Sequence, residues 1–128
     1  MKRLLLDTHV VLWWLADAPQ LGARARELIA DERNDLFVSA VSGWEISIKS
    51  TLGKLEVPEE IQEVIEEEGF ELLPIRFFHG LQAGRLPPLH RDPFDRMLIA
   101  QAQAEGLDLM TSDGVIARYG IRILDASR

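Results

Sequence analysis

The fold is decided by residues 3–15, which read Arg-Leu-Leu-Leu-Asp-Thr-His-Val-Val-Leu-Trp-Trp-Leu. Residues 3–6, with the unbroken apolar run Leu4-Leu5-Leu6, predict a short strand buried on both faces, as in a parallel sheet. Residues 8–15 then show apolar side chains at helical spacing. Asp7 therefore follows a strand, at the sheet edge where open α/β folds bind ligands. From position alone, a cap for the next helix explains Asp7 equally well.

The rest of the chain repeats this alternation of strand and helix. Further short apolar segments that fit strands lie at 36–38, 70–73, 107–110 and 122–124. Segments that fit helices lie at 21–31, 40–52, 58–68, 77–83 and 93–105. Strands alternating with helices indicate an α/β fold whose parallel sheet is covered on both faces. No repeat or linker interrupts the pattern, so we expect residues 1–128 to form a single domain.

Composition narrows the class of protein. The chain has 128 residues, 47% of them hydrophobic, and no cysteine, which excludes disulfides, thiolate metal sites and a cysteine nucleophile. No apolar run approaches the roughly 20 residues that span a bilayer. Asp7 interrupts the N-terminal apolar run before the core of a signal peptide can form. We therefore expect a soluble, cytoplasmic protein with no membrane association.

The net charge of −7 is unusual for a protein that binds nucleic acid. One third of the acidic residues, seven glutamates, lie in the segment 59–71, which contains no Lys or Arg. The remaining 14 acidic residues balance the 14 Lys and Arg. We interpret the segment as a solvated helix face. The net charge therefore neither supports nor excludes an RNA substrate.

Glu45 is the carboxylate whose position most strongly suggests a function. The predicted helix 40–52 carries an apolar stripe formed by Val41, Trp44, Ile48 and Leu52. Glu45 lies within this stripe, where a carboxylate is costly unless it is paired or bound to a cation. The alternative is an ion pair with Lys49, which is worth only roughly 0.2–0.5 kcal/mol and does not explain an inward-facing position.

Two further carboxylates lie at the ends of predicted elements. Asp113 follows the strand at 107–110, at the same sheet edge as the first strand's carboxylate, although a turn would also explain it. Asp95 lies in the first turn of helix 93–105, near its apolar stripe, where complementing the helix dipole is the alternative. The neighbouring Asp92 suits the N-cap of that helix, and we assign it to capping.

Together these carboxylates predict a cation site. Crowded carboxylates repel one another and favour protonation unless a cation lies between them. Oxygen-only ligands suit Mg²⁺ or Mn²⁺, which can activate water and hold a phosphodiester for in-line attack. We expect Asp7, Glu45, Asp95 and Asp113 to be the catalytic residues and metal ligands. Replacing Asp7 or Asp95 with Asn should then raise the stability of the metal-free protein, because repulsion is relieved.

Four segments carry a family signature. They are Leu5-Leu6-Asp7-Thr8-His9, Ser42-Gly43-Trp44-Glu45-Ile46-Ser47-Ile48-Lys49, Asp92-Pro93-Phe94-Asp95-Arg96-Met97-Leu98-Ile99-Ala100-Gln101-Ala102 and Thr111-Ser112-Asp113. In their order and spacing they resemble the PIN-domain family, and within it the VapC toxins of type II toxin–antitoxin pairs. The resemblance covers essentially the whole chain.

The resemblance implies a three-layer fold with a five-stranded parallel sheet of order 3-2-1-4-5, flanked by helices. It places the family's acidic quartet, as ligands of Mg²⁺ or Mn²⁺, on Asp7, Glu45, Asp95 and Asp113. It implies an endoribonuclease that hydrolyses phosphodiester bonds of single-stranded or looped RNA, whose backbone can reach a shallow groove. It also implies a homodimer held inactive by an antitoxin whose tail occupies the cleft.

Several neighbours of the quartet have two interpretations. Thr8 and Thr111 could orient water or a carboxylate, although a Thr at a strand end is often only a cap. Lys49 and Arg96 lie within one helical turn of a quartet member, so they could contact phosphate or only neutralise the carboxylates. His9 has no second histidine at ligand spacing, so we assign it a supporting or packing role.

Other residues give weaker signals. The sequence around His79 and His90 gives even less evidence for a role at the site than that around His9. The core or a dimer interface explains the remaining aromatic candidates, Trp13, Trp14, Phe77 and Phe78.

Three other classes of protein share parts of this pattern. A HAD-type phosphatase needs a second Asp two residues after the first, where this chain has His9. A response-regulator receiver needs an Asp after its third strand, where this chain has Leu73-Pro74-Ile75. A non-catalytic RNA-binding PIN-like module would normally have lost part of the quartet. A housekeeping RNA-processing PIN nuclease would share the same catalytic residues and remains the alternative to a toxin.

Overall fold

A parallel sheet forms the middle of the protein. The computed structural model describes all residues, 1–128. The five strands are β1 (Arg3–Leu6), β2 (Asp35–Ser39), β3 (Glu71–Leu73), β4 (Asp108–Thr111) and β5 (Ile123–Asp125). All neighbouring strands pair in parallel, in the order β3-β2-β1-β4-β5. The order implied by the family resemblance is confirmed.

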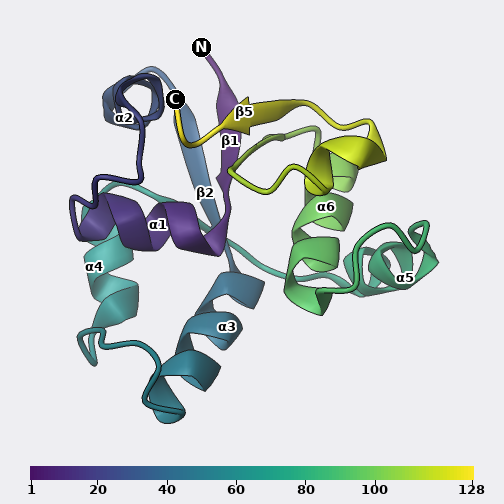
Figure 1. Cartoon of the computed structure of the whole chain (residues 1–128), viewed down its shortest axis with the longest axis horizontal. Helices are drawn as coiled ribbons and strands as arrows, with labels where there is room; N and C mark the ends of the chain where they lie inside the picture. Colours follow the sequence, from purple (N-terminus) through teal and green to yellow (C-terminus); the bar gives the residue numbers. More distant parts are fainter.

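Helices cover both faces of this sheet (Figure 1). They are α1 (Thr8–Leu15), α2 (Ala23–Ala30), α3 (Ala40–Thr51), α4 (Ile61–Glu67), α5 (Phe77–Arg85) and α6 (Pro93–Glu105), with a 3₁₀ turn, η1, at Ile116–Tyr119. None of them is long and apolar enough to cross a bilayer. The bounds of α1 and α6 agree with the sequence prediction.

The alternation of side chains along β1 produces two cores. Leu4 and Leu6 point to one face, where they pack with residues of α1, α2 and α4. Leu5 points to the other face, where it packs with residues of α3, α6 and η1. All three leucines are fully buried, as expected of a central strand in a parallel sheet. The result is the predicted arrangement of three layers.

Capping side chains fix where the key helices begin. Asp7 accepts a hydrogen bond from the backbone N–H of the second α1 residue, and Ser39 does the same for α3. Both caps come directly after, or at the end of, a strand, so both helices start at the carboxyl edge of the sheet. Asp92 caps α6, with Pro93 in its first position, as predicted from the sequence.

One predicted helix boundary is wrong. The segment 58–68 was expected to become helical at Pro58, but α4 begins only at Ile61, after a turn at residues 59–60. The cap position, Glu60, makes no side-chain capping bond. The fixed φ of proline fits an extended loop as well as a first helical turn, so Pro58 alone did not determine the boundary.

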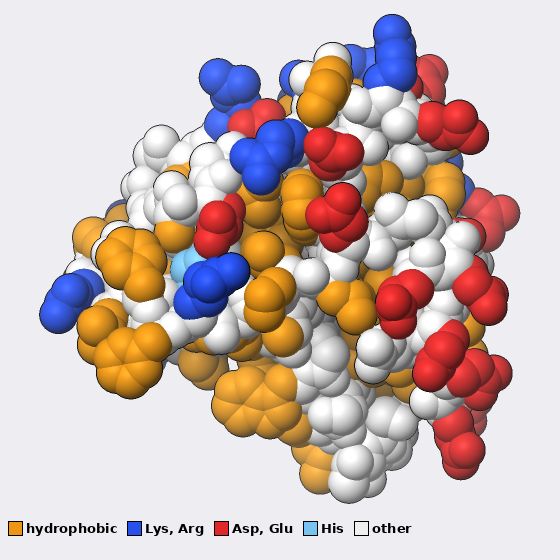
Figure 2. All heavy atoms as spheres, turned by 180° about the vertical axis from the view of Figure 1, so that it is seen from behind, with side chains coloured by type: hydrophobic (Ala, Val, Ile, Leu, Met, Phe, Trp, Pro, Cys, Tyr) orange, Lys and Arg blue, Asp and Glu red, His pale blue; other side chains and the backbone are white.

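The two ends of the molecule differ in surface character. All seven glutamates of segment 59–71 are exposed, which confirms the prediction of a solvated acidic face over and around α4. On the opposite side, over α5, apolar side chains gather (Figure 2). They include Phe77, Phe78 and Leu81, which are all exposed. Their exposure excludes the core for these two phenylalanines and leaves the dimer interface as the expected role.

Candidate metal centre

Asp7 both caps α1 and faces the carboxyl edge of the sheet. Its side chain is nearly fully buried, and its backbone N–H donates to the Met110 carbonyl on β4 at 3.0 Å. Oδ1 accepts from the His9 N–H at 2.9 Å, and Oδ2 accepts from the Thr111 hydroxyl at 2.7 Å. Burial acts to raise the pKa of Asp7, but the hydrogen bonds from His9 and Thr111 outweigh it and lower that pKa below its ordinary value.

Thr111 joins Asp7 to Asp113. While its hydroxyl donates to Asp7, the same oxygen accepts from the Asp113 N–H at 3.1 Å. Oδ1 of Asp113 in turn accepts from the Val115 N–H at 2.8 Å, which closes the turn after β4. Because β1 and β4 are neighbours, their carboxyl ends meet here. Of the two expected roles, the geometry supports Thr111 as a residue that orients carboxylates.

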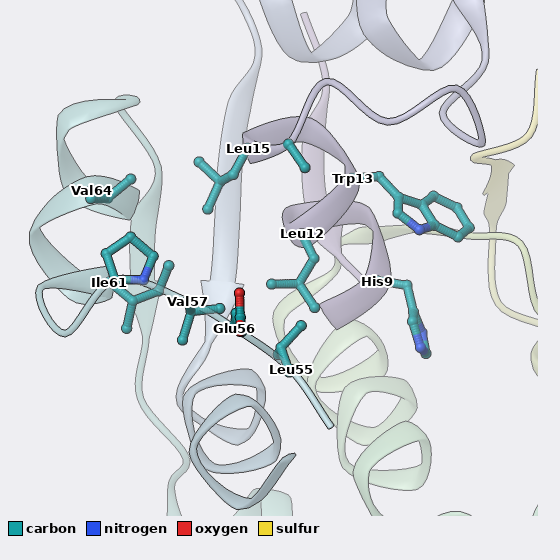
Figure 3. A pocket seen from close by; sticks show the side chains of 11 residues that line it. His9, Leu12, Trp13, Leu15, Leu55, Glu56, Val57, Ile61 and Val64 are labelled. Atoms are coloured by element: carbon teal, nitrogen blue, oxygen red, sulfur yellow. The ribbon is translucent and has the colours of Figure 1, made fainter. Parts of the chain in front are cut away.

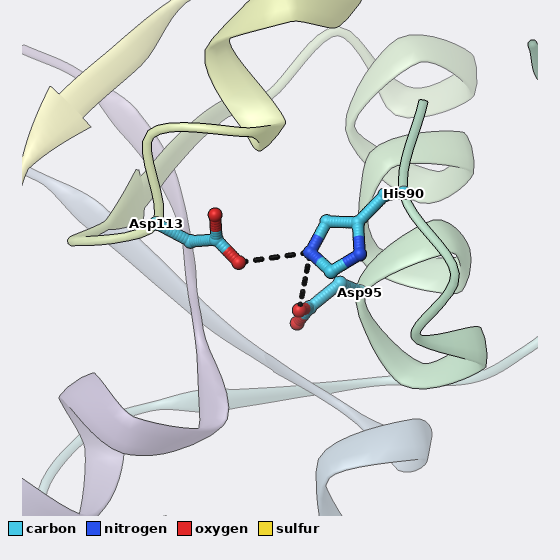
Figure 4. Close-up of side chains that lie close together, drawn as sticks. All are labelled: His90, Asp95 and Asp113. Carbon is cyan, nitrogen blue, oxygen red and sulfur yellow. Dashed lines mark hydrogen bonds and ion pairs between the residues drawn. The ribbon is translucent and has the colours of Figure 1, made fainter. Parts of the chain in front are cut away.

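Asp95 and Asp113 meet at a histidine. His90 Nε2 lies 2.8 Å from Asp113 Oδ2 and 3.0 Å from Asp95 Oδ2, between the first turn of α6 and the loop after β4 (Figure 4). The three side chains offer ligand atoms that all lie within 4.8 Å of one another. His90 was passed over in the sequence, because no local pattern shows that the loop before α6 folds over the site.

The electrostatics of Asp95 fit a cation site. Burial, followed by the negative charges of Asp7 and Asp92, raises the pKa of Asp95 to about 7, and Asp113 adds to this while His90 opposes it. A carboxyl group whose pKa is raised by neighbouring carboxylates lies in a region of negative potential, which favours the binding of a cation. The cluster of side chains could therefore hold a metal ion.

Glu45 is buried, but the reason given from the sequence was partly wrong. Trp44 and Leu52 of the expected apolar stripe are 59% and 63% exposed, whereas Glu45 is only 5% exposed. The face of α3 that turns inward consists of Val41, Ser42, Glu45 and Ile46. Glu45 Oε2 accepts from Lys49 Nζ at 2.8 Å, so the alternative ion pair is formed, and it partly neutralises a buried carboxylate.

Thr8 and His9 follow Asp7 and interact with α3, the helix that carries Glu45. The hydroxyls of Thr8 and Ser42 lie 2.7 Å apart and tie the start of α1 to α3. His9 Nδ1 lies 3.5 Å from Asp7 Oδ1, and its hydrogen bond with Asp7 raises the pKa of His9. The charges of Glu45 and Lys49 also act on His9. Thr8 therefore links helices, and His9 has the supporting position expected of it.

Arg96 does not face the carboxylates. Its guanidinium donates, at distances of 2.8 to 3.2 Å, to the carbonyl oxygens of Ala83, Leu86, Pro87 and His90. These bonds tie α6 to the end of α5 and the following loop. The arrangement argues against both roles expected for Arg96, phosphate contact and neutralisation of Asp95. Only Lys49, half-exposed and paired with Glu45, keeps a position compatible with phosphate.

The four expected ligands thus fall into a close group and a neighbour. Asp7, Asp95 and Asp113 lie close enough for the charges of the other two to act on Asp95. The charge of Glu45 acts on His9, which is bonded to Asp7, and Glu45 carries its own counter-ion, Lys49. An open apolar pocket of about 450 Å³ begins beside His9 and extends between α1, the loop before α4 and α4 itself (Figure 3).

Residues 4–122 match the PIN domain, and the chain belongs to this family. Ribonuclease VapC22 of Mycobacterium tuberculosis is 28% identical over 116 residues, which cover 88% of each chain. DNA-bound VapBC from Salmonella typhimurium shares the fold with a TM-score of 0.71 and 22% identity, over 98% of both chains. VapBC-1 from nontypeable Haemophilus influenzae has a TM-score of 0.71 and 16% identity, over 98% of this chain and 99% of that one.

Proposed function

We propose that this protein is a Mg²⁺- or Mn²⁺-dependent endoribonuclease, the toxin of a type II toxin–antitoxin pair. The observation that carries the proposal is the convergence of Asp7, Asp95 and Asp113 at the carboxyl edge of the sheet, with the buried Glu45 beside them. Membership of the PIN-domain family and the likeness to Ribonuclease VapC22 support RNA as the substrate.

The residues of the site have separate roles in the proposed reaction. A divalent cation, when bound, stabilises the charge that develops on the phosphate and makes water a better nucleophile. Thr111 holds Asp7 and the backbone of Asp113 in place for that ion. Glu45 would join them as a ligand, and Lys49, which is half-exposed and donates to Glu45, would supply positive charge for a substrate phosphate.

The partner that we propose is a protein antitoxin. Solved relatives are described as VapBC complexes, and the apolar pocket beside His9 offers a protein segment a place next to the carboxylates (Figure 3). We further propose a cytoplasmic location and a homodimer. The exposed apolar side chains over α5 supply a surface that two copies could bury.

Cleavage assays with purified protein test the proposal. RNA should be cut with Mg²⁺ or Mn²⁺ and left intact with excess EDTA. Asp7→Asn and Asp113→Asn should each abolish cleavage, because each removes a ligand charge while keeping the shape of the side chain. Asp31→Asn is the matched control, since Asp31 precedes β2 and lies at the opposite edge of the sheet. Undiminished cleavage in EDTA would exclude the metal-dependent mechanism.

A growth assay separates a toxin from a housekeeping nuclease. Expression of the wild type should arrest growth, and co-expression of its antitoxin should relieve it. Asp113→Asn should be harmless when expressed alone. RNA cleavage without growth arrest would favour the housekeeping role, and RNA binding without cleavage would favour a non-catalytic module.

A further inference from the structure

Hydrogen bonds in the loop before α6 fix the orientation of one side chain, that of His90. The His90 N–H donates to the Tyr119 hydroxyl oxygen at 2.7 Å, and Arg96 donates to the His90 carbonyl at 3.2 Å. The Tyr119 hydroxyl itself donates to the Pro87 carbonyl at 2.8 Å. The backbone of His90 is thus held on both sides by side chains from α6 and η1. Neither Arg96 nor Tyr119 contacts a carboxylate, whereas both bond to the backbone of His90.

The hydrogen bonds of the imidazole define its tautomer. Nδ1 accepts from the Asp92 N–H at 3.2 Å, so in the neutral ring the proton lies on Nε2. That Nε2–H points at Oδ2 of Asp113 and lies within reach of Oδ2 of Asp95, at 2.8 Å and 3.0 Å (Figure 4). A histidine that binds a metal through Nε2 normally donates its other N–H to an acceptor. Here the other nitrogen faces a donor, which is the wrong polarity for a ligand.

We propose that His90 is a positioning residue, whose Nε2–H spans Asp95 and Asp113 and sets the separation at which these two carboxylates bind a cation. The inference rests on the proposed function and deepens it. Each carboxylate oxygen has two lone pairs, so an oxygen that accepts from His90 can still bind an ion.

The role follows from how the four carboxylates are held. Thr111 donates to Asp7, and Lys49 donates to Glu45. Asp95 and Asp113 come from different elements and repel one another, and His90 Nε2 is within 3.0 Å of an oxygen of each, hydrogen-bonded to Asp113 and close to Asp95. Without it, the loop after β4 and the first turn of α6 have no side-chain bridge at the site. The cation would then have to bring the two carboxylates together itself.

Manganese affinity in the absence of RNA tests the inference. His90→Ala should weaken Mn²⁺ binding by about 10- to 100-fold, the usual effect of losing a partner that orients a ligand. His90→Gln should regain most of the affinity, because its amide nitrogen can reach the place of Nε2 and donate. Arg91→Ala, an exposed neighbour in the same loop, should bind like the wild type. Unchanged affinity in a folded His90→Ala protein would overturn the inference.

Two further measurements do not depend on that variant folding. In Tyr119→Phe, which removes one oxygen, Mn²⁺ affinity should fall in the same direction. In wild-type protein saturated with Mg²⁺, the ¹⁵N spectrum of His90 should still show the proton on Nε2. A proton on Nδ1 instead, with Nε2 bound to the ion, would identify His90 as a ligand and overturn the positioning role. Failure of the wild type to bind Mn²⁺ would contradict the proposed function, whereas binding that is insensitive to His90 contradicts only this inference.

Discussion

Two carboxylates of the site have pKa values that are shifted in opposite directions. Asp7 has a pKa below its ordinary value because it accepts hydrogen bonds from His9 and Thr111 that outweigh its burial. Asp95 has a pKa raised to about 7 by burial and by the charges around it. Two carboxylates at one edge of the sheet therefore contribute to folding with opposite signs.

Asp95→Asn should stabilise the metal-free protein at neutral pH. The folded-state pKa of Asp95 is about 7 against an ordinary value of 3.8, so between these values the folded state holds the proton more tightly. Its contribution is complete below about pH 4 and is lost as the pH rises toward 7. The Asn variant lacks this loss and should gain on the order of 3 kcal/mol at pH 7, because each pKa unit between 3.8 and about 7 is worth about 1.4 kcal/mol. Thermal melts in EDTA at pH 5 and pH 7 check this, and an equal gain at both pH values would contradict it.

Asp7→Asn should instead destabilise the metal-free protein. Because the folded-state pKa of Asp7 is lowered, its contribution is present above the unfolded-state pKa and is lost as the pH falls through the folded-state value. Asn can still accept from the His9 N–H, so the loss at pH 7 should be about 1 kcal/mol. This revises the expectation from the sequence that both Asn variants gain stability. Mn²⁺ should stabilise the wild type by binding linkage and both variants less. An equal Mn²⁺ shift in all three proteins would refute the shared site.

The position of the acidic residues at one edge of the sheet could be predicted from the sequence, but the side-chain contacts around them could not. Asp7, Asp95 and Asp113 could be found because each follows a strand or starts a helix, and such ends meet at one edge of a parallel sheet. Arg96 was misjudged because the partners of a long side chain depend on the path of a distant loop. His90 could not be found for the same reason, since its contact with Asp95 and Asp113 is set by the fold of residues 86–92.

Among the elements, α6 matters most to the site, because it carries Asp95 in its first turn. Asp92 caps this helix by accepting from the N–H groups of Phe94 and Asp95 at 2.8 Å and 3.3 Å. The same Asp92 also raises the pKa of Asp95. The cap and the charge of Asp92 therefore act in opposite directions on stability.

Substitutions at Asp92 separate these two effects. Asp92→Asn keeps a capping oxygen and removes the charge, so it should melt no lower than the wild type without metal. Asp92→Ala also loses the cap and should be about 1 kcal/mol less stable than Asp92→Asn. Thermal melts of both variants in EDTA at pH 7 make the comparison. If Ala and Asn were equally stable, the capping role of Asp92 would be refuted.

Over the whole molecule, local patterns predicted less than the family resemblance did. Periodicity predicted most helices and all five strands to within a few residues. It did not fix the strand order, because which strands become neighbours depends on long-range packing. The order came from the resemblance, and the structure agrees with it. The boundary of α4 was missed where a proline-containing loop carries no capping side chain.

The distribution of charge predicts how RNA binding responds to salt. The acidic face around α4 repels a polyanion, so binding must depend on few cationic contacts, among which we place Lys49. Lys49→Gln should reduce the slope of log affinity against log salt by about 0.7, the value of one phosphate contact on a single strand. Lys2→Gln, at the opposite edge of the sheet, is the matched control. Binding to a non-cleavable RNA measures both, and identical slopes would assign Lys49 to neutralising Glu45 only.

Because β1 is the central strand, the backbone amides of the site should differ in how fast they exchange with deuterium. The Asp7 amide is bonded to β4 at the end of a fully buried central strand, so its exchange with deuterium should require global unfolding. The Asp113 and Val115 amides lie in the turn after β4 and are bonded only to side chains, those of Thr111 and Asp113, so they should exchange through local opening. Saturating Mg²⁺ should therefore slow exchange at Asp113 and Val115 by a larger factor than at Asp7. Equal protection of the three amides without metal would show that the site opens only when the whole protein unfolds.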